Sequence, residues 1–398
     1  MADILSATDG AIPSAADAMA RARDRLAHDR IVVNGVALVM VSMQDFSQGS
    51  RTGHSGRLVA WASASVALAC VVVLMTGCTR SDQQPVSTPV SSAPSTVQGP
   101  RSTLLIADAA GFIEKVTPDG VVSIVAGNGD NKSAPVPGPA IDSPMHPYDV
   151  AVGPDGSIFI ADYNGYVERV TPDGMLSVVA GNGQNPISSP RPGPVATDSA
   201  LLPMGIDSDA SGNLFIASFG LIVEVTPDGV LSIIAGTGII SGAPVPGPAI
   251  DSPIDPIAVA VDKAGNLYAA DHSNGYVVRI TTEGVLSILA SPSTYATPAP
   301  SATMNYGGIT PYAITVGTTG NVYTAEYGGP IERMTPDGAW SVVDDIGGYG
   351  IAVDRAENIY AATTASVFQI TSDGVRSCVA NCEINGPMKP YGVAVWPS

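Results

Sequence analysis

A repeated phrase constrains the fold of this chain more than any other feature. Thr-Pro-Asp-Gly, or a close variant of it, occurs six times, at spacings of 54, 55, 55, 54 and 36 residues. The phrases begin at Thr117, Thr171, Thr226, Thr281, Thr335 and Thr371. An apolar alternating run precedes each phrase and a valine-rich run follows it. Because Pro fixes φ and Gly supplies a positive φ, each phrase predicts the turn of a β-hairpin.

Two further kinds of strand complete each repeat. One kind is typified by residues 158–162 and the other by residues 148–152, with a Gly-Pro-Asp-Gly turn between them. Four short strands per unit, with no helical periodicity, predict an all-β fold, a six-bladed β-propeller. The repeats start at residue 103 with one kind of strand and end at residues 391–395 with the other. The C-terminal strand is therefore expected to complete the first blade and close the ring.

Composition narrows the range of partners. Hydrophobic residues make up 45% of the 398, which is enough for a core, whereas charged residues are only 14%, which argues against coiled coils. The net charge is −18. Nucleic acid is therefore not an expected partner, because phosphate binding needs clustered Lys and Arg.

The units resemble NHL repeats. Within one unit, residues 256–262, residues 265–271, Arg279 and residues 285–289 show most of that family's pattern, and the resemblance extends over residues 103–398. It implies a propeller that acts as a binding module, such as the sensor domains of bacterial receptor kinases or protein- and RNA-binding domains elsewhere. Kinase motifs are missing from this sequence, and its acidic balance disfavours RNA.

Two sets of residues are expected on one face of the propeller, where inner strands begin and second strands end. Four of six inner strands begin with Tyr, which suits recognition at the channel mouth, although packing between blades is the alternative. The carboxylates after the second strands could attract a cation or basic partner, or could accept backbone hydrogen bonds in their own turns. The candidate ligand-binding residues are Tyr148, Tyr312, Tyr349, Tyr391, Asp108, Asp162, Asp271 and Glu326.

The loops between blades are long and Pro-rich, which is often a mark of function in a compact domain. Four of them are expected over residues 128–147, 182–203, 237–256 and 291–311, whereas a fifth is cut to residues 344–348. This short loop would leave a notch in the rim, a candidate entry side.

Evidence for catalysis is weaker. His146 and His272 are the two histidines of the propeller, so a three-His zinc centre is impossible within it and no metal site is assigned. His272, with Glu326, remains a candidate general base. The glycine-rich Gly-Asn-Gly turns precede no helix that could bind phosphate, so no cofactor is expected.

Residues 58–77 form a 20-residue run without a charge, preceded by Arg51, His54 and Arg57. This pattern is typical of a signal peptide, and Leu74-Met75-Thr76-Gly77-Cys78 resembles the lipobox of bacterial lipoproteins. Cys78 would then carry the lipid, although Met75 departs from the usual pattern. An uncleaved transmembrane anchor is the alternative, and both place the propeller outside the membrane.

The remaining segments complete the predicted domain organisation. Residues 1–57 have no assigned structure, and Met43 is an alternative start that would give the signal a normal n-region. Residues 78–102 form a Ser/Thr/Pro-rich linker that is expected to be a disordered, extended spacer. Cys378 and Cys382 are expected to form a disulfide in an oxidising compartment, two thiols being the alternative.

The sequence therefore predicts a propeller that is lipid-anchored or held by a single span at the extracytoplasmic face of the cell membrane, and that binds a protein, peptide or glycan of the envelope. A divalent-metal-dependent lyase or hydrolase in the channel is the alternative function. A purely scaffolding lipoprotein is a third possibility.

Overall fold

The computed structural model describes residues 100–184, 192–292, 310–382 and 388–396, and the backbone of a short hairpin, β1 (Val32–Val33) and β2 (Val36–Ala37). The chain divides into two compact units, residues 1–87 and 88–398. The predictions for residues 1–57 (that hairpin apart), the run 58–77, Cys78 and the linker up to residue 99 lie outside the described residues. Within the part that is described, no helix is long and apolar enough to cross a membrane.

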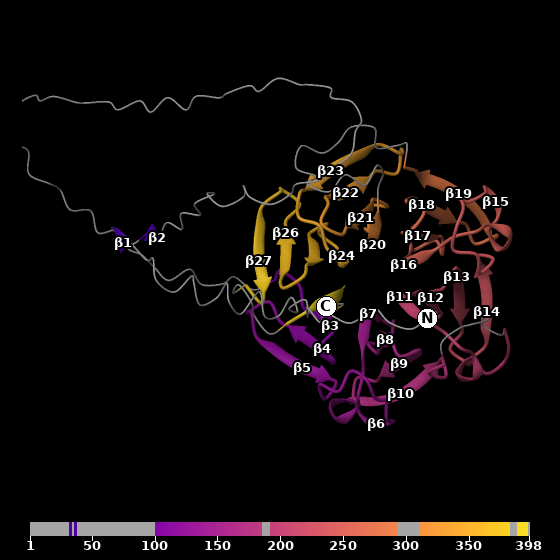
Figure 1. Cartoon of the computed structure of the whole chain (residues 1–398), viewed down its shortest axis with the longest axis horizontal. Coiled ribbons are helices and arrows are strands. Elements are labelled where there is room, and N and C mark those ends of the chain that lie inside the picture. The colour runs from indigo at the N-terminus through magenta and orange to yellow at the C-terminus, as the bar shows by residue number, and fades with distance from the viewer. Residues whose placement is uncertain are drawn as a thin grey trace, which may run out of the picture. The chain divides into compact units, whose positions relative to one another are not determined.

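The second unit is a six-bladed β-propeller (Figure 1). Each blade is an antiparallel sheet of four main strands, ordered from the inner strand to the outer strand, and the sheets of blades 2 and 4 have a fifth, two-residue strand beyond the outer one. The C-terminal strand β28 is the inner strand of blade 1 and pairs with β3, with Val395 opposite Leu104. The predicted fold class and ring closure by the C-terminal strand are confirmed.

The first half of the ring comprises three blades, each ordered from its inner to its outer strand. Blade 1 holds β28 (Pro390–Val395), β3 (Leu104–Asp108), β4 (Phe112–Val116) and β5 (Val122–Ala126). Blade 2 holds β7 (Pro147–Val152), β8 (Ile158–Asp162), β9 (Tyr166–Val170) and β10 (Met175–Ala180). Blade 3 holds β11 (Pro203–Ser208), β12 (Leu214–Ser218), β13 (Leu221–Val225) and β14 (Leu231–Ala235).

The second half of the ring follows the same order. Blade 4 holds β16 (Pro256–Val261), β17 (Leu267–Asp271), β18 (Tyr276–Ile280) and β19 (Val285–Ala290). Blade 5 holds β20 (Pro311–Val316), β21 (Val322–Glu326), β22 (Ile331–Met334) and β23 (Trp340–Asp344). Blade 6 holds β24 (Gly350–Val353), β25 (Ile359–Ala362), β26 (Val367–Ile370) and β27 (Arg376–Ala380).

The Thr-Pro-Asp-Gly phrase forms the turn between the third and outer strands. In blade 1, Gly120 has φ +81° and its N–H donates to Thr117 O at 2.8 Å. The Thr117 hydroxyl donates to Asp119 and contacts Val121 O at 3.2 Å. The same bonds recur at Thr171, Thr335 and Thr371, so the phrase is a self-contained hairpin signal.

The core consists of six apolar clusters, one at each junction between neighbouring blades. The cluster between blades 2 and 3, for example, contains Phe159, Leu201 and Ile216. Both faces of the second strands β3, β8 and β12 are buried in this way, which explains why those strands read as nearly continuous apolar runs. Blades are therefore held to each other by the hydrophobic effect as well as by the closing strand.

Three interblade loops carry an extra edge segment, which we call a cap. The caps comprise residues 134–143, 192–199 and 243–252, and they lie on the outer strands of blades 2, 3 and 4. β6 (Gly138–Pro139) pairs with β10, Gly193 bridges Leu231, and β15 (Gly247–Pro248) pairs with β19. Each cap ends in a short 3₁₀ turn, η1 (Ala140–Asp142), η2 (Ala196–Asp198) and η3 (Ala249–Asp251).

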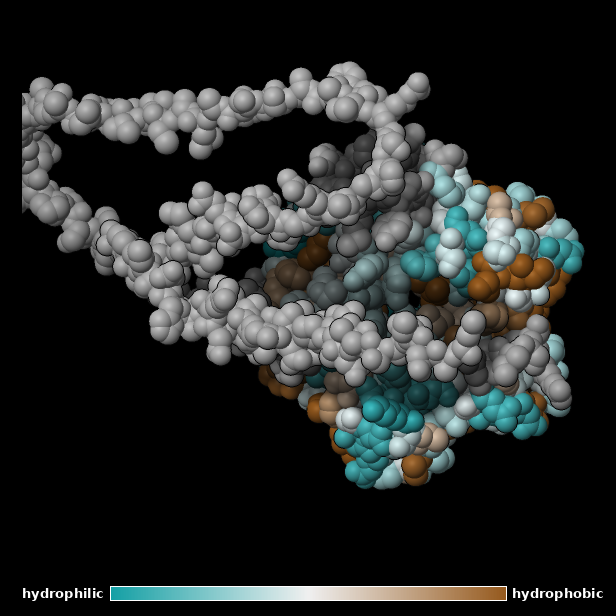
Figure 2. All heavy atoms as spheres, in the orientation of Figure 1, coloured by the Kyte–Doolittle hydropathy of each residue, from teal (hydrophilic) through white to brown (hydrophobic). Residues whose placement is uncertain are grey.

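One alanine in each cap joins two blades. The Ala140 N–H donates to Gly174 O at 2.8 Å, and its carbonyl accepts from Gly127 N at 2.9 Å. Ala196 and Ala249 make the same pair of bonds, and all three are almost fully buried. The caps thus cover edge strands that would otherwise expose a row of unpaired backbone groups. Their own apolar side chains, such as Val136 and Ile141, stay exposed, and hydrophobic residues are scattered at the periphery of the propeller in Figure 2.

Candidate functional site: the aromatic mouth

An irregularity in the inner strands places one side chain of each blade at the channel mouth. Each inner strand except β24 begins with Pro, and that Pro pairs with the last residue of the second strand. The register then shifts, so the residue after the Pro has no partner in the second strand. A residue at such a β-bulge is turned out of the sheet's alternation. In blades 1, 2 and 5 this residue is Tyr391, Tyr148 and Tyr312, so the strands begin one residue earlier than predicted.

The four predicted tyrosines gather into one cluster that spans blades 5, 6, 1 and 2. Tyr148 stacks on Tyr391, with ring centroids 4.9 Å apart and planes at 20°. Tyr349 meets Tyr391 edge to face at 5.0 Å and Tyr312 edge to face at 5.2 Å. The mouth is completed by Met204 and Ile257 of blades 3 and 4, which line a small central cavity with Tyr148, Tyr312 and Tyr349.

The channel beneath these rings is almost closed. The hydroxyls of Tyr148 and Tyr312 share a hydrogen bond between blades 2 and 5, which lie opposite each other in the ring of six. The inner strands also approach one another closely. A Cβ atom added at Gly350 would lie only 2.3 Å from Tyr391 O. The remaining cavity is about 30 Å³, room for a water or two. Within the described residues, the mouth is therefore a surface that closes the channel behind it.

The environment favours the protonated hydroxyl groups of Tyr148, Tyr312 and Tyr349. Burial raises the pKa of Tyr148, and its hydrogen bond with Tyr312 raises it further. Burial likewise raises the pKa values of Tyr312 and Tyr349. The cluster thus offers apolar ring faces together with neutral hydroxyl groups that can donate and accept.

The predicted carboxylates bind backbone groups of the interblade connections. Asp108 accepts the N–H groups of Ala110 at 2.8 Å and Lys389 at 3.0 Å. Asp162 accepts from His146 at 3.0 Å and Asn164 at 2.7 Å, and Asp271 accepts from Asp255 at 3.0 Å. In blades 1, 2 and 4 these contacts fix the start of the inner strand, and hence its residue at the mouth, to the end of the second strand of the same blade.

Glu326 and His272 have separate partners. Burial raises the pKa of Glu326 to about 7, and its backbone carbonyl accepts from Gly348 N at 3.1 Å. The His272 ring lies edge-on to Tyr312 at 5.2 Å, and its Nδ1 lies 3.3 Å from Pro311 O. Among the described residues, no three His, Cys, Asp or Glu side chains gather around a common point that could hold a metal ion.

Sequence reasoning did not place four further aromatic residues at the mouth, although it named His272 as a candidate general base. Tyr163 stacks on Tyr148 at 5.7 Å, and Tyr327 lies 5.0 Å from Tyr349. His146 contacts Tyr163, and His272 contacts Tyr312. A signal was available for three of them, because Tyr163, His272 and Tyr327 each directly follow a strand-end carboxylate. Tyr163 is 43% exposed and Tyr327 is 52% exposed, so these two are the most accessible rings of the cluster.

The comparison with protein families agrees with the repeat pattern. A family model described as the teneurin NHL domain matches residues 118–181, which contain the outer strand β5 of blade 1 and all the strands of blade 2. This match and the six four-stranded blades agree with the resemblance to NHL repeats. No curated protein matches the chain.

Solved structures similar to the propeller include three bacterial proteins. A catalytically inactive virginiamycin B lyase from Staphylococcus aureus, with quinupristin, is 15% identical, with a TM-score of 0.45 over 74% of this chain and 87% of that one. A protein of unknown function from Bacteroides caccae is 15% identical, with a TM-score of 0.47 over 75% and 99%. A gluconolactonase from Xanthomonas campestris is 15% identical, with a TM-score of 0.44 over 76% and 91%. No activity is assigned to this chain from them.

Cys378 and Cys382 form a disulfide, with Cα atoms 5.6 Å apart, at the end of the outer strand of blade 6. It lies beside Asn381, whose carbonyl accepts from Ser366 Oγ at 2.9 Å. The bond ties the start of the last interblade loop to its own blade.

Proposed function

We propose that the propeller is an extracytoplasmic binding module, tethered to the membrane through Cys78 or an uncleaved span, and that the aromatic mouth is its ligand site. The observation that carries this proposal is the continuous Tyr cluster of four consecutive blades. Rings that only served blade packing would be covered, whereas Tyr163 and Tyr327 keep about half of their surface accessible. An exposed aromatic cluster on a rigid scaffold suits recognition of a protein, peptide or glycan.

The rigid base supports this role. The mouth tyrosines sit on bulged strands whose backbones are packed against neighbouring blades, so little side-chain order has to be gained on binding. The closed channel means that a ligand is contacted from one side, as a polymer or a protein surface would be. The Pro-rich loops into blades 2 and 4 reach the same face, where Asn131 O accepts from Asn164 and Ile240 O accepts from Asn274, and they would add contacts around the mouth.

The test is quantitative recovery of envelope proteins and cell-wall glycans on the full-length chain, compared with a Tyr163→Ala, Tyr327→Ala double variant. These accessible rings can be removed without opening the core, and Val342→Ala, at a 57% exposed position of the outer strand β23, is the control. We expect binding of the specific ligand to fall about tenfold or more in the double variant and to be unchanged in the control. Equal recovery on all three proteins would remove the mouth as the site.

The anchor is tested separately by fractionation of a Cys78→Ala variant. Loss of lipid labelling together with release from the membrane would support the lipoprotein form. Unchanged membrane retention would favour the uncleaved span.

A further inference from the structure

A second site lies on the opposite face, at the turns that join inner and second strands. In blades 3, 4 and 6 the turn begins with Asp, and its carboxylate accepts the N–H of the third turn residue. The bonds are Ser211 N to Asp209, Ala264 N to Asp262 and Ala356 N to Asp354, each at 2.9 Å. In these three blades the N–H of the third turn residue therefore binds a carboxylate.

Blade 5 shows that the carboxylate can come from elsewhere. Its turn begins with Gly317, and Glu357 of blade 6 reaches across to supply the missing group. Glu357 accepts from Thr319 N at 3.2 Å and from Tyr323 Oη at 2.7 Å. Glu357 is the fourth residue of its own turn and has φ +60°, a conformation for which blades 2 to 5 use Gly.

In blade 2 the carboxylate is supplied neither by the first residue of the turn nor by the neighbouring blade. Its turn begins with Gly153, and the residue of blade 3 that corresponds to Glu357 is Gly212. Phe159 stands where blade 5 has Tyr323. The outcome is a groove of about 390 Å³ between blades 2 and 3, within the size range of small-molecule sites. Among the bonds of the described residues, the N–H of Asp155, the third turn residue, has no acceptor.

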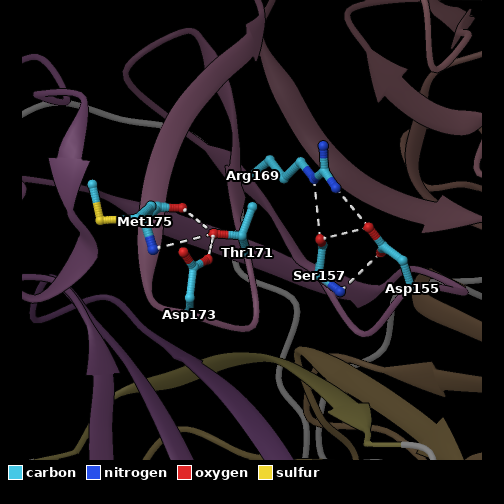
Figure 3. Close-up of polar contacts among 6 residues, drawn as sticks. All are labelled: Asp155, Ser157, Arg169, Thr171, Asp173 and Met175. Atoms are coloured by element: carbon cyan, nitrogen blue, oxygen red, sulfur yellow. Dashed lines mark hydrogen bonds and ion pairs between the residues drawn. The ribbon is translucent and has the colours of Figure 1, made fainter.

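A cation lies beside this free N–H. Arg169, on β9, donates from Nε to Ser157 Oγ at 3.0 Å and from Nη2 to Asp155 Oδ2 at 2.6 Å (Figure 3). Its Nη1 donates to nothing within the described ranges, and the guanidinium lines the groove. The hydrogen bonds from Ser157 and Arg169 hold the pKa of Asp155 below its usual value, so Asp155 stays a carboxylate that fixes the arginine in place.

We propose that this groove binds a small organic acid with an apolar body. Its carboxylate would accept from Asp155 N and Arg169 Nη1, as Glu357 accepts in blade 5. Its apolar part would pack on Phe159, Leu214 and Val225, which line the floor. The site is independent of the aromatic mouth, because it lies at the other end of the inner strands.

The first experiment titrates full-length protein with octanoate and with the neutral octanamide, by ligand-observed NMR. We expect saturable binding of octanoate and at least about tenfold weaker binding of octanamide, the effect of losing charge-assisted hydrogen bonds. Arg169→Gln should weaken octanoate binding by a similar factor. Arg279→Gln, the same position in blade 4, should leave it unchanged.

A second variant fills the groove without removing the arginine. Gly212→Glu copies Glu357, whose positive φ shows that the turn accepts Glu, and should abolish octanoate binding. Gly265→Glu, the same turn position in blade 4, is its control. Equal binding of octanoate to wild type, Arg169→Gln and Gly212→Glu, equal affinity for octanamide, or no saturable binding to the wild type would each overturn the proposal.

Discussion

Blades 2 to 4 and the seam formed by blades 6 and 1 are built from the same repeat but finish their outer edges differently. In blades 2, 3 and 4 a cap covers the outer strand, and at most 3% of the surface of each outer-strand leucine is exposed. These residues are Leu176, Leu231 and Leu286. The corresponding residue of blade 1, Val122, is 47% exposed. The loops that enter blades 6 and 1 span only residues 345–349 and 381–389, against 127–146 for the loop into blade 2.

The difference shows that one repeat can be stabilised in two ways. The capped blades are held at the periphery by loop backbone and buried leucines. Within the described residues, the seam lacks caps and is joined by the borrowed strand β28, whereas close contacts between inner strands occur in both regions, at Gly350 with Tyr391 and at Gly205 with Ile257. The long loops thus have a structural role along with any role in recognition.

Deletion of residues 390–398 is expected to have the largest effect. It removes the inner strand of blade 1 and exposes the clusters on both sides of it, which should cost more than the ~5–15 kcal/mol that stabilises a typical domain. Loss of the cooperative urea transition, followed by circular dichroism, would show this. A normal transition in the truncated chain would mean that the ring needs no closure.

Gly350→Ala should damage the seam next most strongly. Its Cβ would lie 2.3 Å from a carbonyl of the closing strand, which backbone movement must relieve at a cost of about 3–5 kcal/mol. Gly193→Ala, in the cap of blade 3 with no atom within 4 Å of the new Cβ, is the control. Equal urea midpoints for the two variants would contradict the tight seam.

Leu231→Ala and Val122→Ala compare a capped position with its uncapped equivalent. Leu231 is 1% exposed, so its truncation should cost about 2–5 kcal/mol. Val122 is half exposed and should cost less than about 1 kcal/mol. If both variants lose the same stability by denaturant unfolding, the cap does not provide the burial that we ascribe to it.

The smallest expected effect concerns pH. Burial, and then the charge of Asp108, raises the pKa of Glu114 in blade 1 from 4.5 to about 7, whereas blades 3 and 4 have Val223 and Val278 at this position. The folded state therefore holds a proton that the unfolded state releases. This contribution is complete below pH 4.5 and is lost as the pH rises through about 7.

Thermal unfolding at pH 5 and pH 8 should accordingly show lower stability at pH 8. Glu114→Gln should reduce that difference by ~1 kcal/mol, given the partial exposure of the side chain. An unchanged pH dependence in Glu114→Gln would assign the effect to other buried carboxyls, such as Asp149, whose pKa burial also raises to about 7.

The fold was predictable because each hairpin is specified locally. The Thr171-to-Gly174 turn satisfies its own backbone, and the alternation around it sets the strands. The four inner-strand tyrosines were also readable, since Pro-Tyr begins three of these strands. What they contact was not, because the partners of Tyr148 come from blades 1 and 5, far away in sequence.

The second site could not be found from sequence. It depends on Gly153, where blades 3, 4 and 6 carry Asp, on Gly212, where blade 6 carries Glu357, and on these two positions meeting across a junction. A missing side chain becomes informative only when the position that it would have filled is known. Likewise, no pattern showed that Pro-rich loops would lie along outer strands as caps.

The hydroxyl bond between Tyr148 and Tyr312 has a consequence for partner size. Because this bond lies across the central channel, a ligand at the mouth does not have to pass through the propeller or present a free chain end. Under the proposed function, a polymer or a large protein surface would contact the mouth from outside the channel, at any point along its length.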